Sequence, residues 1–316
     1  IENRIKLFSP DIIFSRWENK KIKKNFTKNF IKKFYFKNIS KYFDKIKYHK
    51  INNVNYLSTN DFFTLFTSGS TGVPKGVVHS YGGYFLYSKY SCEKQFGMNK
   101  NSIMLCASDA GWINGHTYAY ALFGPLSFGA TSILLESPLL VTNYKIFLKI
   151  LSLKPTILYF PVTLIRLIKL LYQNKIFKSK SVTTLGSMGE PLAPSVAKWF
   201  EKKFLNNNSS IVNTYFQTET GGIISSPKYN DKISISPHGS VGKPISEYIK
   251  LNKLNDKIKK EIKILTPWPG MMKRILNNKK TWSKYWDKNG NFRMFDLATL
   301  KNNNIYIHGR TDDVIN

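Results

Sequence analysis

Short apolar runs and helical repeats alternate along most of the chain. Between Asp61 and about Pro237, runs of β-branched and aromatic residues predict strands. The clearest of these strands are residues 131–135, 156–160 and 182–185. Apolar residues at helical spacing over 164–172 predict one helix, and an amphipathic repeat over Pro194–Phe204 predicts another. Strands that alternate with helices in this way are typical of a layered α/β domain with a partly parallel sheet.

The two ends of the chain have different patterns of apolar and polar residues. Residues 1–60 predict a short strand at 11–14, followed by a lysine-rich stretch that is helical or irregular. After Gly239, short strands alternate with clusters of Asn, Gly and Pro. The strands expected there are residues 248–251, 260–265 and 304–308. We therefore expect α/β subdomains over 1–238 and a smaller β-rich subdomain, such as a distorted barrel, over 239–309.

The segment between Asp109 and Glu136 carries no formal charge, and its length invites comparison with a membrane span. Glycines, a proline and several polar side chains interrupt it, which is atypical of such spans. We interpret it as a buried strand–loop–strand and expect no membrane partner.

Composition indicates a globular protein in a reducing compartment. Of the 316 residues, 42% are hydrophobic and 15% aromatic, which excludes a disordered chain. Cys92 and Cys106 provide neither a disulfide framework nor metal-ligand spacing, so a cytoplasmic location is expected. The sequence opens on Ile1 without a signal-like segment, and we expect that the natural start lies further upstream.

The net charge of +29 invites a nucleic-acid or anionic-membrane interpretation. The excess is mostly lysine, scattered among Asn, Ile and Phe, and no nucleic-acid-binding module accompanies it. We therefore expect no specific nucleic-acid partner. A basic polyanion binder stays open as an alternative.

The most informative stretch follows an apolar run at residues 62–66. There Thr67 to Gly76 reads Thr-Ser-Gly-Ser-Thr-Gly-Val-Pro-Lys-Gly. Glycines let main-chain N–H groups face outward, and hydroxyls and an ammonium beside them suit a polyphosphate. The common P-loop pattern does not fit, because Lys75 lies between Pro74 and Gly76. A Gly/Ser-rich surface turn is the alternative for such a loop taken alone.

This string resembles the phosphate-binding signature of the AMP-forming acyl-CoA synthetases, which belong to the adenylate-forming superfamily. Four further segments resemble the same family in the same order, and they are residues 108–118, 186–191, 213–222 and 309–316. The sequences around Trp112 and Phe216 look most like acetyl-CoA and propionyl-CoA synthetases. The resemblance implies a large N-terminal domain of layered sheets with flanking helices, a smaller β-rich barrel-like subdomain, and a hinge at 310–316.

The resemblance also implies a reaction. A carboxylate attacks the α-phosphate of ATP, pyrophosphate leaves, and coenzyme A captures the acyl-adenylate, with Mg²⁺ beside the phosphates. The implied catalytic residues are Thr67, Lys75 and Glu219, with Glu219 holding the metal ion. The implied nucleotide-binding residues are Ser68, Gly69, Ser70, Thr71, Gly72, Gly189, Glu190, Pro191, Asn213, Thr214, Tyr215, Phe216, Gln217, Thr218, Asp296 and Arg310. Among them, Asp296 and Arg310 would grip the ribose hydroxyls.

For the acid pocket, the resemblance points to Ile113, Asn114, Met188 and Phe216. Acetyl-CoA synthetases usually have tryptophan where this chain has Phe216, so a short acid, from acetate to propionate or slightly longer, is expected. One methylene changes binding by only ~1–3 kcal/mol in such a pocket, so the acid stays open. His116 is interpreted as a structural histidine. Plain core packing is the alternative for the four pocket residues.

The sequence departs from the family at four places. One is the segment 136–139, which is shorter and lacks an asparagine that the acetyl-type enzymes have near CoA. Phe295 precedes Asp296 where the family has glycine, which leaves the local turn open. The chain stops just after Asp312, the expected hinge residue, where the family has a C-terminal domain. The segment before Ile1 is also expected to be missing. We therefore expect a central fragment that binds ATP weakly and turns over poorly alone.

Two alternatives from the resemblance remain. One is an adenylation domain that loads a carrier protein. The other is a degenerate nucleotide-binding module without catalysis.

Overall fold

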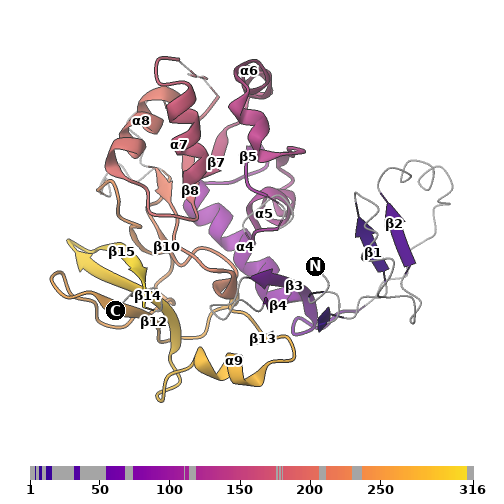
Figure 1. Cartoon of the computed structure of the whole chain (residues 1–316), viewed down its shortest axis with the longest axis vertical. Helices are drawn as coiled ribbons and strands as arrows, with labels where there is room; N and C mark the ends of the chain where they lie inside the picture. The colour runs from indigo at the N-terminus through magenta and orange to yellow at the C-terminus, as the bar shows by residue number, and fades with distance from the viewer. Residues whose placement is uncertain are drawn as a thin grey trace.

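A parallel five-stranded sheet forms the centre of the protein (Figure 1). This computed structural model describes residues 4, 7–8, 12–15, 32–35, 55–67, 74–109, 111–113, 119–175, 177, 179, 181–205, 211–229 and 237–311. The strand order is β6-β5-β7-β8-β9, and every neighbouring pair is parallel. The strands are β5 (Ile103–Cys106), β6 (Thr131–Ile133), β7 (Ile157–Pro161), β8 (Thr184–Met188) and β9 (Val212–Asn213).

Helices cover both faces of this sheet. They are α4 (Tyr81–Phe96), α5 (Gly124–Ser127), α6 (Tyr144–Ser152), α7 (Val162–Leu171) and α8 (Pro194–Phe204), with shorter helical turns at η2 (Ala119–Phe123) and η3 (Pro138–Thr142). Successive side chains of a strand point to opposite faces. On β7, Ile157 and Tyr159 belong to the core cluster that contains α4, whereas Leu158 and Phe160 belong to the cluster of α6, α7 and α8. The predicted α/β class with a parallel sheet and flanking helices is confirmed.

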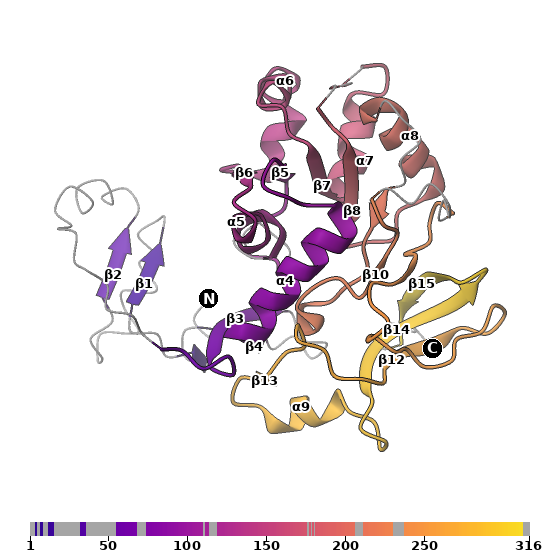
Figure 2. The same ribbon diagram turned by 180° about the vertical axis from the view of Figure 1, so that it is seen from behind.

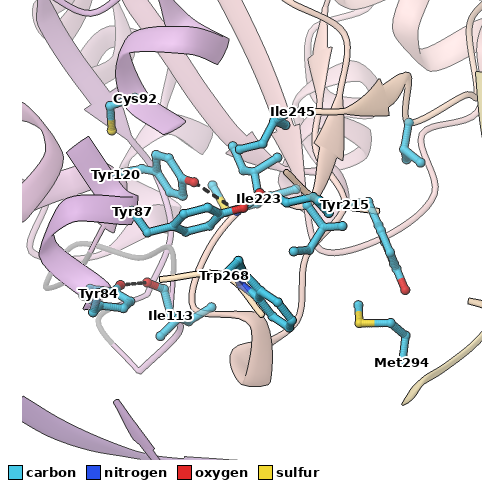
Figure 3. Packing of buried hydrophobic residues seen from close by; sticks show 14 of the residues in the cluster. Tyr84, Tyr87, Cys92, Ile113, Tyr120, Tyr215, Ile223, Ile245, Trp268 and Met294 are labelled. Carbon is cyan, nitrogen blue, oxygen red and sulfur yellow. Dashed lines mark hydrogen bonds between the residues drawn. The ribbon is translucent and has the colours of Figure 1, made fainter. Parts of the chain in front are cut away.

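The first of these clusters includes several buried tyrosines, some of which Figure 3 shows from close by. Tyr87 donates a hydrogen bond to the carbonyl of Ile223 at 2.5 Å, and the hydroxyl of Tyr120 accepts one from the amide of the same residue at 3.2 Å. Tyr84 donates to the carbonyl of Ile113 at 3.1 Å. Buried phenols need such partners, so these bonds fix α4 to the loops that carry the candidate site.

Two antiparallel sheets and a short ladder lie beside the central sheet (Figure 2). The first sheet has the order β13-β4-β3, with β3 (Asp61–Thr67), β4 (Lys75–Ser80) and β13 (Arg274–Ile275). The second has the order β12-β14-β15, with β12 (Lys260–Ile264), β14 (Phe292–Lys301) and β15 (Asn304–Arg310). The ladder joins β10 (Ser225–Ser226) to β11 (Lys243–Pro244). The remaining elements are the η4 turn (Thr218–Thr220), α9 (Lys279–Lys284) and the parallel pair β1 (Ile12–Ser15) and β2 (Lys32–Tyr35).

Several predicted elements are confirmed. The helix over Pro194–Phe204 has both predicted ends, and the strands at 131–135, 156–160, 260–265 and 304–308 are present within two residues of their predicted bounds. The strand predicted at 11–14 is also present, one residue later. The strand predicted at 182–185 begins at Thr184 and extends to Met188.

Three predictions about local structure are wrong. Residues 248–251 form no strand, and only Leu251 makes an isolated bridge, to Ile264. The strand–loop–strand expected within 109–136 is helical over 119–127, although β6 follows it. The lysine-rich stretch contains the unpredicted strand β2. Among the described helices, none is both long and apolar enough to cross a membrane.

Strand pairing joins the two regions expected to divide near residue 239. β11 and β13 come after this point in the sequence, yet they pair with β10 and β4, which come before it. The division at 238/239 and the hinge at 310–316 stay predictions.

Phe204 provides a test of the second core cluster. Its ring is fully buried and stacks on Phe177 with centroids 5.0 Å apart. Phe204→Ala is expected to lower the free energy of unfolding by about 3–5 kcal/mol, because it leaves a cavity between α6 and α8. Leu170→Ala, at a side chain that is 78% exposed, is the control and should change it by less than about 0.5 kcal/mol. Urea denaturation of both variants measures the difference, and equal effects would contradict this assignment of the core.

Candidate active site

The carboxyl ends of β5, β8 and β9 lie at one edge of the parallel sheet, where α/β folds commonly bind ligands. The loops that leave this edge include residues 108–109, 111–113, 189–191 and 214–217. All of these belong to segments that carry the sequence motifs. The topology therefore brings together residues that lie up to about one hundred positions apart in the sequence.

A buried hydrogen-bond network fixes two of these loops. The side chain of Asn213 accepts from Ser187 Oγ at 2.9 Å and donates to the carbonyl of Ser240 at 2.7 Å. Thr214 Oγ1 donates to the carbonyl of Ser187 at 2.7 Å and lies 2.8 Å from the hydroxyl of Tyr159. Both side chains are thus hydrogen-bonded within the protein, and their contact with a nucleotide stays a prediction.

Asp296 is the centre of a second polar cluster. Its Oδ2 accepts hydrogen bonds from Tyr215 and from Gln217, each at 2.6 Å, and its Oδ1 lies 3.9 Å from a guanidinium nitrogen of Arg310. Asp296 as a whole is 8% exposed. Burial and the charge of Asp296 raise the pKa of Tyr215, so the phenol stays protonated and donates. The sequence-predicted pair Asp296 and Arg310 is therefore adjacent, on directly paired positions of β14 and β15.

The residue before Asp296 has a left-handed backbone, a conformation that favours glycine. Phe295 has a φ of 56°, a conformation that costs a residue with a Cβ roughly 1–2 kcal/mol. Its ring packs against Tyr285 with centroids 5.4 Å apart and lies 4.6 Å from the guanidinium of Arg293. The amide of Thr311 donates to its carbonyl at 2.7 Å. These contacts hold the turn that the sequence left open.

Lys75, Glu219 and Tyr285 form a compact cluster of charge. Lys75 Nζ lies 2.7 Å from Glu219 Oε1, and the Tyr285 hydroxyl donates to the same oxygen at 2.6 Å. Lys75 also donates to the Tyr285 hydroxyl. Burial by itself raises the pKa of Glu219, but the Lys75 ammonium and the Tyr285 hydroxyl outweigh it, so that the net pKa is lowered. Glu219 is therefore an ionised carboxylate that is 7% exposed.

Backbone contacts fix the η4 turn around Glu219. The amide of Met272 donates to the carbonyl of Glu219 at 2.9 Å, and the indole of Trp268 donates to the carbonyl of Thr220 at 3.0 Å. Gly221 has a φ of 69°, and a Cβ there would collide with the carbonyl of Gly270. The turn that presents Glu219 is thus rigidly defined.

His79 joins β4 to this turn. Its Nε2 lies 2.8 Å from the carbonyl of Thr218, which can only accept, so Nε2 carries the proton. Burial lowers the pKa of His79 from 6.5 to about 4, although the Thr218 carbonyl and the Glu219 charge act in the opposite direction. The imidazole is therefore neutral near neutral pH.

Three of the four predicted acid-pocket residues lie in one cluster. Ile113 and Met188 are buried in the core cluster of α4, and Phe216 is half-buried against it. Asn114 lies outside the described residues.

The other sequence-predicted residues have varied surroundings. Glu190 is exposed and pairs with Arg166 at 3.0 Å, while Gly189 has a φ of 88°. Thr67 ends β3 opposite Lys75, and its buried Oγ1 makes no hydrogen bond with the residues that the structure describes. Ser68, Gly69, Ser70, Thr71, Gly72, His116 and Asp312 lie outside the described residues. Within the described ranges, no three His, Cys, Asp or Glu side chains are grouped as metal ligands.

Sequence reasoning missed Tyr285 and the role of His79. Tyr285 lies among aromatic residues that resemble ordinary core, and 210 positions separate it from Lys75. His79 follows directly on the apolar run of β4, where it is easily mistaken for a surface end of the strand.

Comparisons with known proteins show the family of the chain. A family model described as AMP-binding enzyme matches residues 18–275. The chain is 35% identical over 273 residues to the acetyl-coenzyme A synthetase of Helicobacter pylori (strain P12), covering 82% of this chain and 41% of that protein. It is 34% identical over 268 residues to acetyl-coenzyme A synthetase 2 of Saccharomyces cerevisiae (strain ATCC 204508 / S288c), covering 80% and 39% respectively. The chain thus spans about two fifths of the length of these curated relatives.

The fold has a counterpart among solved structures. The crystal structure of the anthranilate CoA ligase AuaEII in complex with anthranoyl-AMP superimposes with a TM-score of 0.82. The match covers 99% of this chain and 60% of that chain at 18% sequence identity. A likeness at this identity shows the fold alone.

His79 predicts a pH dependence of stability. Because its folded pKa is about 4 and its ordinary value is 6.5, the unfolded chain binds the proton first as the pH falls. The free energy of unfolding is therefore expected to fall by up to about 3 kcal/mol as the pH falls from 6.5 to about 4. Below about pH 4, His79 is protonated in both states and contributes no further change. His79→Gln keeps an uncharged donor and should lack this component. Urea denaturation from neutral pH to about 4 measures the difference, and identical pH slopes for the two proteins would contradict the assignment.

Proposed function

Since this chain belongs to the AMP-binding enzyme family, we propose that it carries the nucleotide and acid site of an AMP-forming acid–CoA ligase that acts on a short carboxylic acid. Acetate is the first choice, and propionate or another short acid is the alternative. The observation that carries the proposal is the convergence of Lys75, Glu219 and Asp296 beside the carboxyl edge of the sheet. The polyphosphate, the metal ion and the ribose each need one of these three groups.

Each charged residue would bind a different part of the nucleotide. Lys75, at the end of the β3–β4 hairpin, would hold the phosphates that leave as pyrophosphate, because an ammonium stabilises the charge that develops on them. Asp296 faces Arg310 and accepts hydrogen bonds from Tyr215 and Gln217, and a carboxylate in this place would suit the hydroxyls of a ribose. The carboxylate of the acid is itself the nucleophile, and it is ionised near neutral pH without a general base.

Glu219 is the residue that would hold Mg²⁺. It is ionised and buried, and carboxylate oxygen is the ligand that this ion prefers. The ion would neutralise negative charge on the phosphates, and phosphate oxygens would complete its coordination. Coenzyme A would then accept the acyl group.

Phe216 supports a small acid. Its ring is half-buried against the cluster that contains Ile113 and Met188, so it forms a wall in this region. A phenylalanine wall is smaller than the tryptophan that the acetyl-type enzymes have there. Room for one additional carbon is the expected consequence.

Acid-dependent pyrophosphate release tests this proposal. The protein is supplied with ATP, Mg²⁺ and CoA, and with acetate, propionate, butyrate or acetoacetate in turn. Release with acetate or propionate, together with AMP, is expected. Nucleotide binding without release for any acid would favour the non-catalytic module. Binding that needs no nucleotide and falls log-linearly with salt would favour a polyanion binder.

Phe216→Trp tests the pocket wall. The larger ring is expected to lower kcat/KM for propionate by about tenfold relative to acetate, the scale of one methylene in such a pocket. The same pyrophosphate assay measures the ratio, and Trp199→Phe, at a side chain on the far side of the sheet, is the control. An unchanged ratio would mean that Phe216 does not touch the acid.

A further inference from the structure

Tyr285 lies directly after α9, and its hydroxyl is placed between the two charges of the candidate site. It donates to Glu219 Oε1 at 2.6 Å and accepts from Lys75. The residue is 4% exposed. The same carboxylate oxygen therefore has two partners, an ammonium and a phenol.

The ring of Tyr285 is held independently of these charges. It stacks on Phe292 with centroids 5.6 Å apart and meets Phe295 edge-on at 5.4 Å. The amide of Arg293 donates to its carbonyl at 2.8 Å. The hydroxyl would keep its place if Lys75 moved.

The two charges must separate when a nucleotide binds. Lys75 and Glu219 are 2.7 Å apart, whereas the proposed function directs one to a phosphate and the other to Mg²⁺. A buried carboxylate that loses its cation is strongly destabilised. Of the two side-chain partners of Glu219, the Tyr285 hydroxyl is the one that stays in place. It would keep the Glu219 carboxylate oriented while Lys75 moves to the phosphates.

We propose that Tyr285 is a positioning residue that holds the Glu219 carboxylate in place for the metal–nucleotide complex while Lys75 leaves it for the phosphates. This inference rests on the proposed function. It predicts that Tyr285 acts on nucleotide and metal and not on the acid.

Tyr285→Phe removes the hydroxyl and leaves the ring. The Kd for α,β-methylene-ATP with Mg²⁺ is expected to rise about tenfold, the scale of one hydrogen bond to a charged group. The KM for the acid should change less than twofold, within the spread of an unaffected parameter. Tyr248→Phe, at a tyrosine that is 74% exposed, is the matched control and should behave as the wild type.

A double-mutant cycle shows whether Tyr285 acts through Glu219. In a Glu219→Gln background, Tyr285→Phe should add little to the loss of nucleotide affinity, because the partner is already gone. In a Lys75→Met background the effect of Tyr285→Phe should persist. Tyr285→His keeps a ring that can donate and should recover part of the affinity. If thermal unfolding shows that Tyr285→Phe does not fold, the nucleotide affinity of Tyr285→His is measured in its place.

The outcomes separate the two proposals. A wild-type protein that binds no magnesium nucleotide overturns the proposed function and, with it, the role of Tyr285. A wild type that binds the nucleotide and releases pyrophosphate, with a Tyr285→Phe variant of equal nucleotide affinity, overturns only the role of Tyr285. Additive losses in the Glu219→Gln background also overturn it.

Discussion

A carboxylate buried at the meeting point of three chain segments needs a cation and hydrogen-bond donors, and this requirement organises the site. Glu219 is presented by the η4 turn, Lys75 comes from the β3–β4 hairpin, and Tyr285 follows α9. Removing any one of them leaves the other charges with incomplete partners, which buried groups tolerate poorly. The pairing of β13 with β4 brings the segment of α9 to the hairpin and so makes the cluster possible.

The parts of the fold that were predictable are those in which one face of an element is apolar. α8 shows this well, since Val196, Ala197, Phe200 and Phe204 recur at helical spacing and are buried. α4 was not predicted because its buried face includes Ser88, Ser91 and Gln95, whose polarity hides the periodicity. Ser88 and Ser91 donate to carbonyls one turn earlier in α4, but the further partners of Ser91 and Gln95, Tyr120 and Ser226, come from elsewhere in the chain and cannot be read locally.

The candidate site was likewise predictable only in part. The motif order identified Lys75, Glu219, Asp296 and Arg310, and the structure brings these residues into two adjacent pairs. The motif could not show that the side chains of Asn213 and Thr214 make hydrogen bonds within the protein. Nor could it show how Phe295 tolerates a backbone suited to glycine, because the aromatic and guanidinium contacts that hold it depend on tertiary packing.

The sequence distance across the charge cluster affects how the protein is made. Lys75 and Tyr285 are 210 residues apart, and β4 gains its second neighbour only when β13 has been synthesised. On the ribosome, the hairpin therefore emerges with one edge and its lysine uncovered, while the parallel sheet between them has time to assemble. Lysine at such an edge opposes pairing between nascent chains. The charge cluster of the candidate site can thus be completed only after α9 and Tyr285 have been synthesised, and a ribosome that stalls before α9 leaves Lys75 and Glu219 without the Tyr285 hydroxyl.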